Sequence, residues 1–240
     1  MFRSVHIDRM SQAIVNQIKE AIFQKKLKVG DKLPSERQLM EQFEASRVTV
    51  REALRILEQS GILEIRRGIE GGAYVRDPNT KFINSFLQDM FSLGKIKIPD
   101  LTEARLAVEP FSARLATERC NEENLTILRK NIEETKECLD KKNYEDARLL
   151  NLEFHRLIAQ TSRNMVIFFM IDSMMDIMEN NIASIVLSPL SVFETAKYHE
   201  QICDAMEKGE MNRAEEIMFK HIEQIQRALE VRKENGEIKE

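Results

Sequence analysis

The sequence predicts a mainly α-helical fold in two parts: a winged helix-turn-helix of three helices plus a β-hairpin wing, then an all-α antiparallel bundle of about seven helices. Three observations support this prediction. The length of 240 residues exceeds the usual domain size of ~100 to 200 residues. Two short helical segments precede a β-branched, Gly-containing stretch before residue 76, and every longer segment after residue 80 has helical apolar spacing.

Turn and capping residues mark the limits of the first three helices. Residues 10–24 carry apolar side chains on one helical face, and the following KVGDKLP is predicted to be a turn. Ser35 lies three residues before Gln38, the spacing of a capping box, so a second helix begins there and ends near Glu44. Ser46 can cap a third helix, which stops at Gly61 and whose inward residues are Val50, Ala53, Leu54 and Leu57.

A β-hairpin wing is predicted over residues 62–75, with its turn at residues 67–72. The sequence DPN at residues 77–79 then breaks the chain. The domain boundaries follow: 1–76 for the winged part, 77–80 for a linker, 81–234 for the helical part and 235–240 for a frayed tail. Seven helical segments are expected in the second part, at about 80–93, 99–119, 122–141, 143–161, 164–186, 191–208 and 211–234.

Charge is divided unevenly between the two parts. Residues 1–76 hold 14 Lys and Arg against 10 Asp and Glu, whereas the remainder holds 22 against 30. A basic module joined to an acidic one suits a small nucleic-acid reader attached to another domain. The longest apolar run, residues 165–171, is far shorter than the ~20 residues of a membrane helix. The N-terminus also lacks an apolar signal core, so we expect a cytoplasmic protein that has no membrane partner.

The start of the third helix carries candidate DNA-reading side chains. Arg47 and Arg51 lie four residues apart on one face, and Ser46 and Thr49 add hydroxyl groups. Arginine can read guanine edges in the major groove while hydroxyl groups bind phosphate, and Arg37 of the second helix can join them. The alternative is that these are solvated charges on surface helices.

Together these residues resemble a known family. The segment LPSERQLMEQFEASRVTVREALRILEQSGILEIRRGIEGGAYV, Leu33 to Val75, resembles the DNA-binding domain of the GntR family. The resemblance implies that the protein binds double-stranded DNA, with the wing tip at Arg67 and Gly68 in the minor groove. We expect a homodimer, and a symmetric dimer would bind a pseudo-palindromic site. The resemblance also implies base or phosphate contacts for Arg37, Ser46, Arg47, Thr49 and Arg51. Glu52 is expected to orient an arginine, and Val48 either contacts a thymine methyl group or packs inward.

Three histidines lie on three different predicted helices of the second part. His199 is ten residues before the turn at Gly209 and His221 is twelve after it, so they lie ~15 and ~18 Å along their helices. Asn151 is one helical turn before His155, and both side chains point the same way. The spacing alone leaves two interpretations open, a metal site and three unconnected histidines.

The second half resembles the FCD ligand-binding domain of the FadR subgroup of GntR regulators, through EARLAVEP at residues 103–110, NLEFH at residues 151–155 and the two later histidines. The resemblance implies that these histidines and an acidic residue bind a divalent metal, zinc or nickel. Asn151 stands at the acidic position, so the ligands His155, His199, His221 and Asn151 bring no negative charge. We therefore hypothesise a small carboxylate effector on the metal, with Arg105 pairing with another carboxylate. The alternative for Arg105 is a surface salt bridge to Glu109.

The three cysteines, Cys120, Cys138 and Cys203, form no CxxC pair and are expected to be reduced, buried thiols. The function predicted from these features is a ligand-responsive transcription repressor and not an enzyme. Two alternatives remain: a metal-dependent hydrolase, in which three histidines activate water, and a DNA-binding protein without a ligand. The hydrolase lacks a clear general base, because Glu153 points away from His155 on the helix.

Overall fold

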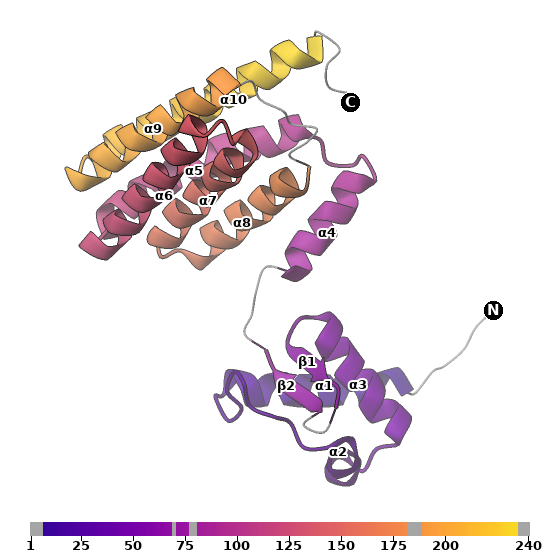
Figure 1. Cartoon of the computed structure of the whole chain (residues 1–240). Coiled ribbons are helices and arrows are strands. Elements are labelled where there is room, and N and C mark those ends of the chain that lie inside the picture. Colours follow the sequence, from indigo (N-terminus) through magenta and orange to yellow (C-terminus); the bar gives the residue numbers. More distant parts are fainter. Residues whose placement is uncertain (1–6, 69–70, 77–80, 182–188, 235–240) are drawn as a thin grey trace. The chain divides into compact units, whose positions relative to one another are not determined.

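The computed structural model describes residues 7–68, 71–76, 81–181 and 189–234. The chain forms two compact units, residues 1–82 and 83–240, each with its own hydrophobic core (Figure 1). The predicted linker 77–80 and the predicted tail 235–240 lie outside the described residues. None of the described helices is long and apolar enough to cross a membrane.

Three helices build the first unit: α1 (Ile7–Phe23), α2 (Glu36–Phe43) and α3 (Arg47–Gln59). The N-terminal caps of α2 and α3 are those that the sequence predicted. Ser35 and Gln38 form the capping box of α2, and the Ser46 side chain accepts a hydrogen bond from the backbone N–H of Thr49. Helix α3 turns Val50, Ala53, Leu54 and Leu57 into the core against α1, so its opposite face is left for solvent.

The wing is an antiparallel hairpin of β1 (Leu63–Arg66) and β2 (Gly72–Val75), in which Leu63 lies opposite Val75. The segment before α2, predicted only as a turn, adds a second, shorter pairing. The backbone N–H of Leu33 donates to the carbonyl of Ala73 at 2.8 Å, and Lys32 forms an isolated bridge with Tyr74. The hairpin is thereby fastened through β2 to the segment that leads into α2.

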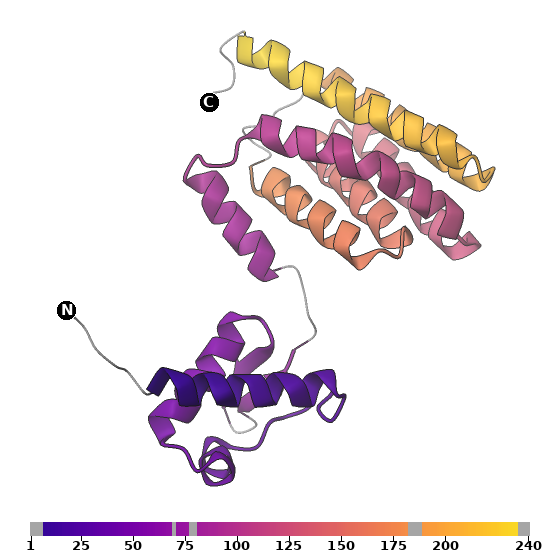
Figure 2. The same cartoon turned by 180° about the vertical axis from the view of Figure 1, so that it is seen from behind.

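Seven helices are described in the second unit: α4 (Lys81–Ser92), α5 (Ile98–Arg119), α6 (Glu122–Asp140), α7 (Tyr144–Thr161), α8 (Met165–Asn180), α9 (Pro189–Glu207) and α10 (Met211–Glu234). Figures 1 and 2 show α5 to α10 as a bundle, with α5 beside α10 and α7 between α6 and α8. The predicted segment 164–186 is described as helix to Asn180, and residues 182–186 lie outside the described residues.

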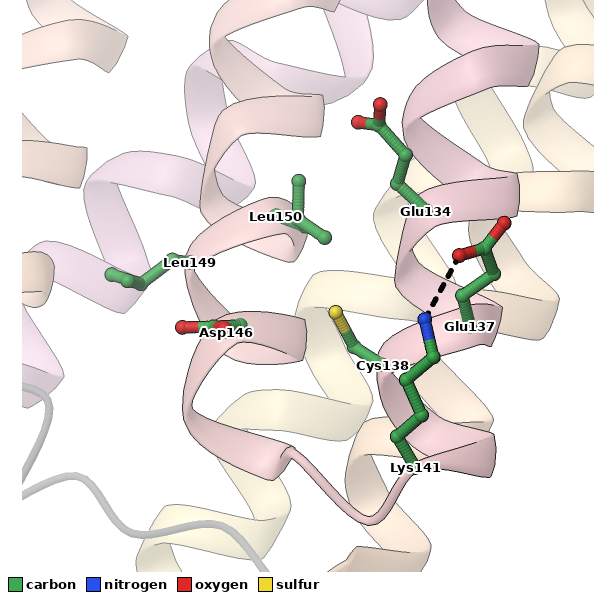
Figure 3. A pocket seen from close by; sticks show the side chains of 7 residues that line it. All are labelled: Glu134, Glu137, Cys138, Lys141, Asp146, Leu149 and Leu150. Atoms are coloured by element: carbon green, nitrogen blue, oxygen red, sulfur yellow. Dashed lines mark hydrogen bonds and ion pairs between the residues drawn. The ribbon is translucent and has the colours of Figure 1, made fainter.

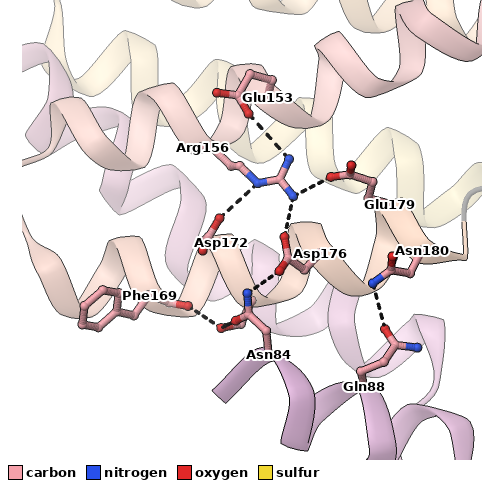
Figure 4. A network of polar contacts seen from close by, with 10 residues as sticks. Asn84, Gln88, Glu153, Arg156, Phe169, Asp172, Asp176, Glu179 and Asn180 are labelled. Carbon is pink, nitrogen blue, oxygen red and sulfur yellow. Dashed lines mark hydrogen bonds and ion pairs between the residues drawn. The ribbon is translucent and has the colours of Figure 1, made fainter. Parts of the chain in front are cut away.

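Helix α4 is held on the bundle by polar contacts in addition to the packing of Leu87 and Phe91 against the core. Asn84 of α4 donates to the carboxylate of Asp176 and accepts a hydrogen bond from the Ser173 hydroxyl group, both on α8 (Figure 4). One turn later, Gln88 accepts a hydrogen bond from Asn180 at 3.4 Å. These contacts fix the rotation of α4 about its own axis.

Asp176 also belongs to an ion-pair network that is centred on Arg156 of α7. The guanidinium lies 3.1 Å from Asp172, 2.8 Å from Asp176 and 2.8 Å from Glu179, all on α8. Figure 4 shows these carboxylates around one arginine, with Asn84 reaching the same group from α4. The network therefore joins α7 to α8 through charged side chains and reaches α4 through the amide of Asn84.

Candidate nucleic-acid interface and buried histidine site

The N-terminal end of α3 presents two arginines held by one carboxylate. The side chains of Arg47 and Arg51 are 64% and 58% exposed, and their Nε atoms lie 3.3 and 3.0 Å from the Glu36 carboxylate. Burial raises the pKa of Glu36, but hydrogen bonds from Arg51 and Arg47 outweigh it and lower that pKa. The two guanidinium groups are thus aligned before any DNA is bound.

Glu36 is an orienting acid that sequence reasoning did not identify. The expected contact of Glu52 with an arginine stays a prediction. The ambiguity at Val48 is resolved, because its side chain is 69% exposed on the face of α3 that points away from the core. Sequence patterns missed Glu36 because it lies on a different helix from the arginines that it holds.

The remaining predicted DNA-reading residues differ in exposure. Arg37 is almost fully exposed and pairs with Glu41 on the surface of α2. Thr49 is buried, and its hydroxyl group lies 2.8 Å from that of Ser46 at the helix start, so only Ser46 of the two is exposed. The wing tip exposes Arg67 and Gly68, and residues 69–70 lie outside the described residues. Gly68 has a φ of +104°, a backbone conformation that favours glycine.

The three histidines of the second unit meet in the centre of the bundle. His155 of α7, His199 of α9 and His221 of α10 are all buried, and one ring nitrogen from each lies within 4.8 Å of the others. The Nε2 atoms of His155 and His221 are 3.3 Å apart. The equal heights predicted for His199 and His221 are confirmed by a ring separation of 5.0 Å.

A buried ion pair from α5 lies against this histidine cluster. Arg105 and Glu109 are each 1% exposed and contact each other, and the Arg105 Nη2 atom is 3.2 Å from the Nε2 atom of His155. Sequence reasoning offered a surface salt bridge as the alternative for Arg105. The pair does form, but it is buried in the bundle.

Glu109 also contacts the Nδ1 atom of His155, and this contact determines the chemistry of the ring. A carboxylate on Nδ1 favours the tautomer with the proton there, which leaves the Nε2 lone pair directed at the other histidines. The same arrangement orients metal-binding histidines in proteins generally. Glu109 was not among the predicted site residues, although its position four residues after Arg105 was a signal that it would face the same way.

Burial and charge keep the three rings neutral. Burial lowers the pKa of His155, and the nearby Glu109 only partly offsets this. Burial, followed by the neighbouring imidazoles and Arg105, holds the pKa values of His199 and His221 well below their ordinary range. Burial alone would raise the pKa of Glu109, but Arg105 and His155 outweigh it and lower the value to about 2. Glu109 is therefore ionised beside neutral imidazoles, which are good metal ligands.

Asn151 is the fourth member of the donor set that the sequence predicted. It lies one turn before His155 on α7, and its buried Oδ1 atom has no hydrogen-bond partner among the described residues. The Nε2 atom of His199 is also buried without such a partner. Unsatisfied buried acceptors are costly, so both atoms fit a site that is completed by a bound cation or donor. The residues present thus fit a divalent metal, provided that Arg105 releases the Nε2 atom of His155.

A hollow lies on the surface between α6 and α7 (Figure 3). Its volume is about 430 Å³, and its lining includes the carboxylates of Glu134, Glu137 and Asp146, with Lys141 paired to Glu137. The excess of negative charge makes this hollow a poor site for a carboxylate ligand.

Cysteine burial follows the prediction only in part. Cys203 is buried, and burial raises the pKa of its thiol to about 12, which argues against a catalytic thiolate. Cys120 and Cys138 are only half-buried, because Cys120 ends α5 and Cys138 lines the surface hollow of Figure 3.

Comparisons with known proteins agree with this geometry. Residues 10–75 match the model of the bacterial regulatory proteins of the gntR family, and residues 100–224 match the FCD domain. The HTH-type transcriptional regulator YcbG of Bacillus subtilis is 32% identical over 91% of this chain and 89% of its own. The putative L-lactate dehydrogenase operon regulatory protein of Escherichia coli is 27% identical over 89% and 84%. The HTH-type transcriptional repressor NanR of Salmonella newport is 26% identical over 90% and 84%. A solved structure, Streptococcus agalactiae GntR, has the same fold, with a TM-score of 0.72, 24% identity and coverage of 92% and 99%.

Proposed function

This chain belongs to the GntR family of bacterial regulatory proteins and carries an FCD domain, and we propose that it is a transcription repressor that responds to a small organic acid. Its relatives are regulators rather than enzymes, so the expectation of a DNA-binding transcription regulator is confirmed at that level. The proposal takes residues 1–76 as the DNA reader, 77–80 as the linker and 81–234 as the effector-binding and dimerisation domain. It places the protein in the cytoplasm, where its DNA lies.

The reader is proposed to bind a pseudo-palindromic operator as a homodimer. Arg47 and Arg51 contact guanine edges in the major groove, and Val48, exposed between them, contacts a thymine methyl group. Arg37 and Ser46 bind phosphate, and Thr49 fixes the Ser46 hydroxyl group at the helix start. Arg67 and Gly68 enter the adjacent minor groove. The exposure and shared carboxylate of the two α3 arginines support this assignment.

The effector site is proposed to be the buried histidine cluster. The observation that carries this proposal is the charge balance: Glu109 and Arg105 cancel each other, while the three histidines are neutral. A divalent zinc or nickel ion held by His155, His199, His221 and Asn151 would therefore keep its positive charge uncompensated. When bound, such an ion supplies a Lewis-acidic centre that favours a carboxylate as a further ligand. Arg105, once free of His155, can pair with a second carboxylate of the same ligand.

The first test is the metal content of protein purified without a metal-affinity tag, measured by mass spectrometry and repeated for His199→Ala. We expect close to one divalent ion per chain in the wild type and its loss in the variant. Glu137→Gln, at an exposed ion pair on α6, is the matched control and should retain the metal. Metal-free wild-type protein would refute the metal-centred site.

One contact favours an alternative version of this proposal, in which the effector site holds no metal. The Arg105 Nη2 atom lies 3.2 Å from the Nε2 atom of His155, so the cluster includes a cationic side chain of its own. In that case the carboxylate effector is bound by Arg105 and the histidines directly. A thermal-shift screen of organic acids with chelator present separates the two versions, because only the metal-free site then retains its response. The DNA-binding protein without a ligand predicts no response under either condition.

A further inference from the structure

Glu36 binds both arginines at the start of α3 through the same atom of the guanidinium group. The Nε atom of Arg51 donates to both carboxylate oxygens, at 3.0 Å each, and the Nε atom of Arg47 donates to one of them at 3.3 Å. Nε carries a single N–H group, and the other donors of an arginine lie on its two Nη atoms. These contacts with Glu36 therefore leave the Nη donors of each arginine for another partner.

The carboxylate is anchored by the start of its own helix. Glu36 is the first residue of α2, directly after the cap at Ser35. The capping box joins Ser35 to Gln38, and Leu39 is buried in the core, so the first turn of α2 is fixed in both position and rotation. The Glu36 side chain is 36% exposed, less than that of either arginine. It therefore gives the two longer side chains a fixed point.

We propose that Glu36 is a positioning residue that sets the sequence specificity of the DNA reader. By occupying Nε, the carboxylate leaves the paired Nη groups of Arg47 and Arg51 to read base edges. A guanine edge offers two acceptors, O6 and N7, which two N–H groups of one arginine can bind together. This inference rests on the proposed function, in which these two arginines read guanine in the major groove.

The charge of Glu36 acts in the same direction as its geometry. Phosphates attract exposed cations whatever the base sequence, whereas contacts to base edges carry the sequence information. A carboxylate between two arginines offsets part of their positive charge and repels nearby phosphates. It therefore weakens binding to any DNA that does not offer the matching base acceptors. Specific interfaces use such repulsive elements to gain discrimination at the expense of affinity.

The test measures the binding of two DNA duplexes by fluorescence anisotropy at several salt concentrations. One duplex is the sequence that the wild-type protein selects from a random library, and the other is a scrambled duplex of the same composition. We expect Glu36→Gln to bind the scrambled duplex more tightly, with a salt dependence steeper by up to about one released counterion. The ratio of the two dissociation constants should fall at least about fivefold, the lower limit for one bidentate base contact. An unchanged ratio would overturn the proposal.

Two further variants separate positioning from charge. Glu41→Gln is the matched control, because it removes the same charge from the same helix but frees only Arg37, 3.2 Å away. It should strengthen binding to both duplexes and leave their ratio unchanged. Glu36→Asp keeps the charge but is one methylene shorter, so it should lose discrimination while its binding to the scrambled duplex stays as in the wild type. A wild-type ratio in Glu36→Asp, or a loss of discrimination in Glu41→Gln equal to that in Glu36→Gln, would overturn the positioning role.

Arg47→Ala distinguishes a failure of this inference from a failure of the proposed function. If Arg47→Ala leaves binding to the selected duplex unchanged, the assignment of base reading to Arg47 fails, and the role of Glu36 fails with it. If Arg47→Ala weakens that binding while Glu36→Gln retains the wild-type ratio, the reader stands and only the role of Glu36 is overturned. All of these measurements use the full chain without metal or effector.

Discussion

Replacing Glu109 with glutamine tests whether the buried pair on α5 is held by charge. The substitution preserves the size of the side chain but leaves the Arg105 cation without its carboxylate, in a position that is 1% exposed. The difference between the ordinary pKa of 4.5 and the value of about 2 in the folded chain corresponds to about 3 kcal/mol of stability. Removing one partner of a buried ion pair independently predicts a loss of about 3 to 5 kcal/mol.

The assay is urea unfolding followed by far-ultraviolet circular dichroism, with a chelator present so that bound metal does not contribute. Glu137→Gln is the control, because its ion pair with Lys141 is exposed and is expected to contribute only about 0.3 to 0.5 kcal/mol. The folded-state pKa of Glu109 lies below the unfolded value. Its contribution is therefore complete above about pH 4.5 and is lost as the pH falls toward 2. A loss below about 1 kcal/mol at neutral pH would refute the reasoning.

Two further predictions concern the reader and the histidines. Arg47→Ala is expected to weaken operator binding by about 1 to 3 kcal/mol and to relax specificity at one base, measured by fluorescence anisotropy with single-base operator variants; unchanged binding would remove Arg47 from the readout. The second prediction concerns the pH dependence of stability. Burial lowers the pKa values of His199 and His221 in the folded chain. Below about pH 6.5 the unfolded chain therefore binds more protons than the folded chain does. Stability should then fall as the pH decreases from 6.5, by up to about 1.4 kcal/mol per pH unit for each histidine. His199→Phe should flatten this dependence, and an equally steep profile in that variant would contradict the assignment.

Features that depend on nearby residues were predictable from the sequence. The caps at Ser35 and Ser46 are local, since each side chain bonds to a backbone group three residues later. The meeting of His199 and His221 follows from the fixed rise of a helix and one turn between them. The burial of Val50 and Leu57 follows from helical periodicity.

Features that depend on the packing of distant segments were not predictable. An arginine and a glutamate four residues apart are usually a surface pair, and nothing in EARLAVEP shows that α5 turns Arg105 and Glu109 into the bundle. Glu36 contacts arginines that lie 11 and 15 residues away, across the turn between α2 and α3. The half-burial of Cys138 depends on a surface hollow between two helices, which no periodicity records.

The adjacency of His155 and Arg156 on α7 links the candidate effector site to α4. Consecutive residues on a helix point in directions about 100° apart, so one faces the histidine cluster while the other faces the carboxylates of α8. A small rotation of α7 that adjusts His155 to a ligand must also move Arg156 relative to Asp176, the carboxylate that binds Asn84. A ligand bound at the histidine cluster would in this way displace the helix that follows the DNA reader, and the size of this effect would depend on ionic strength.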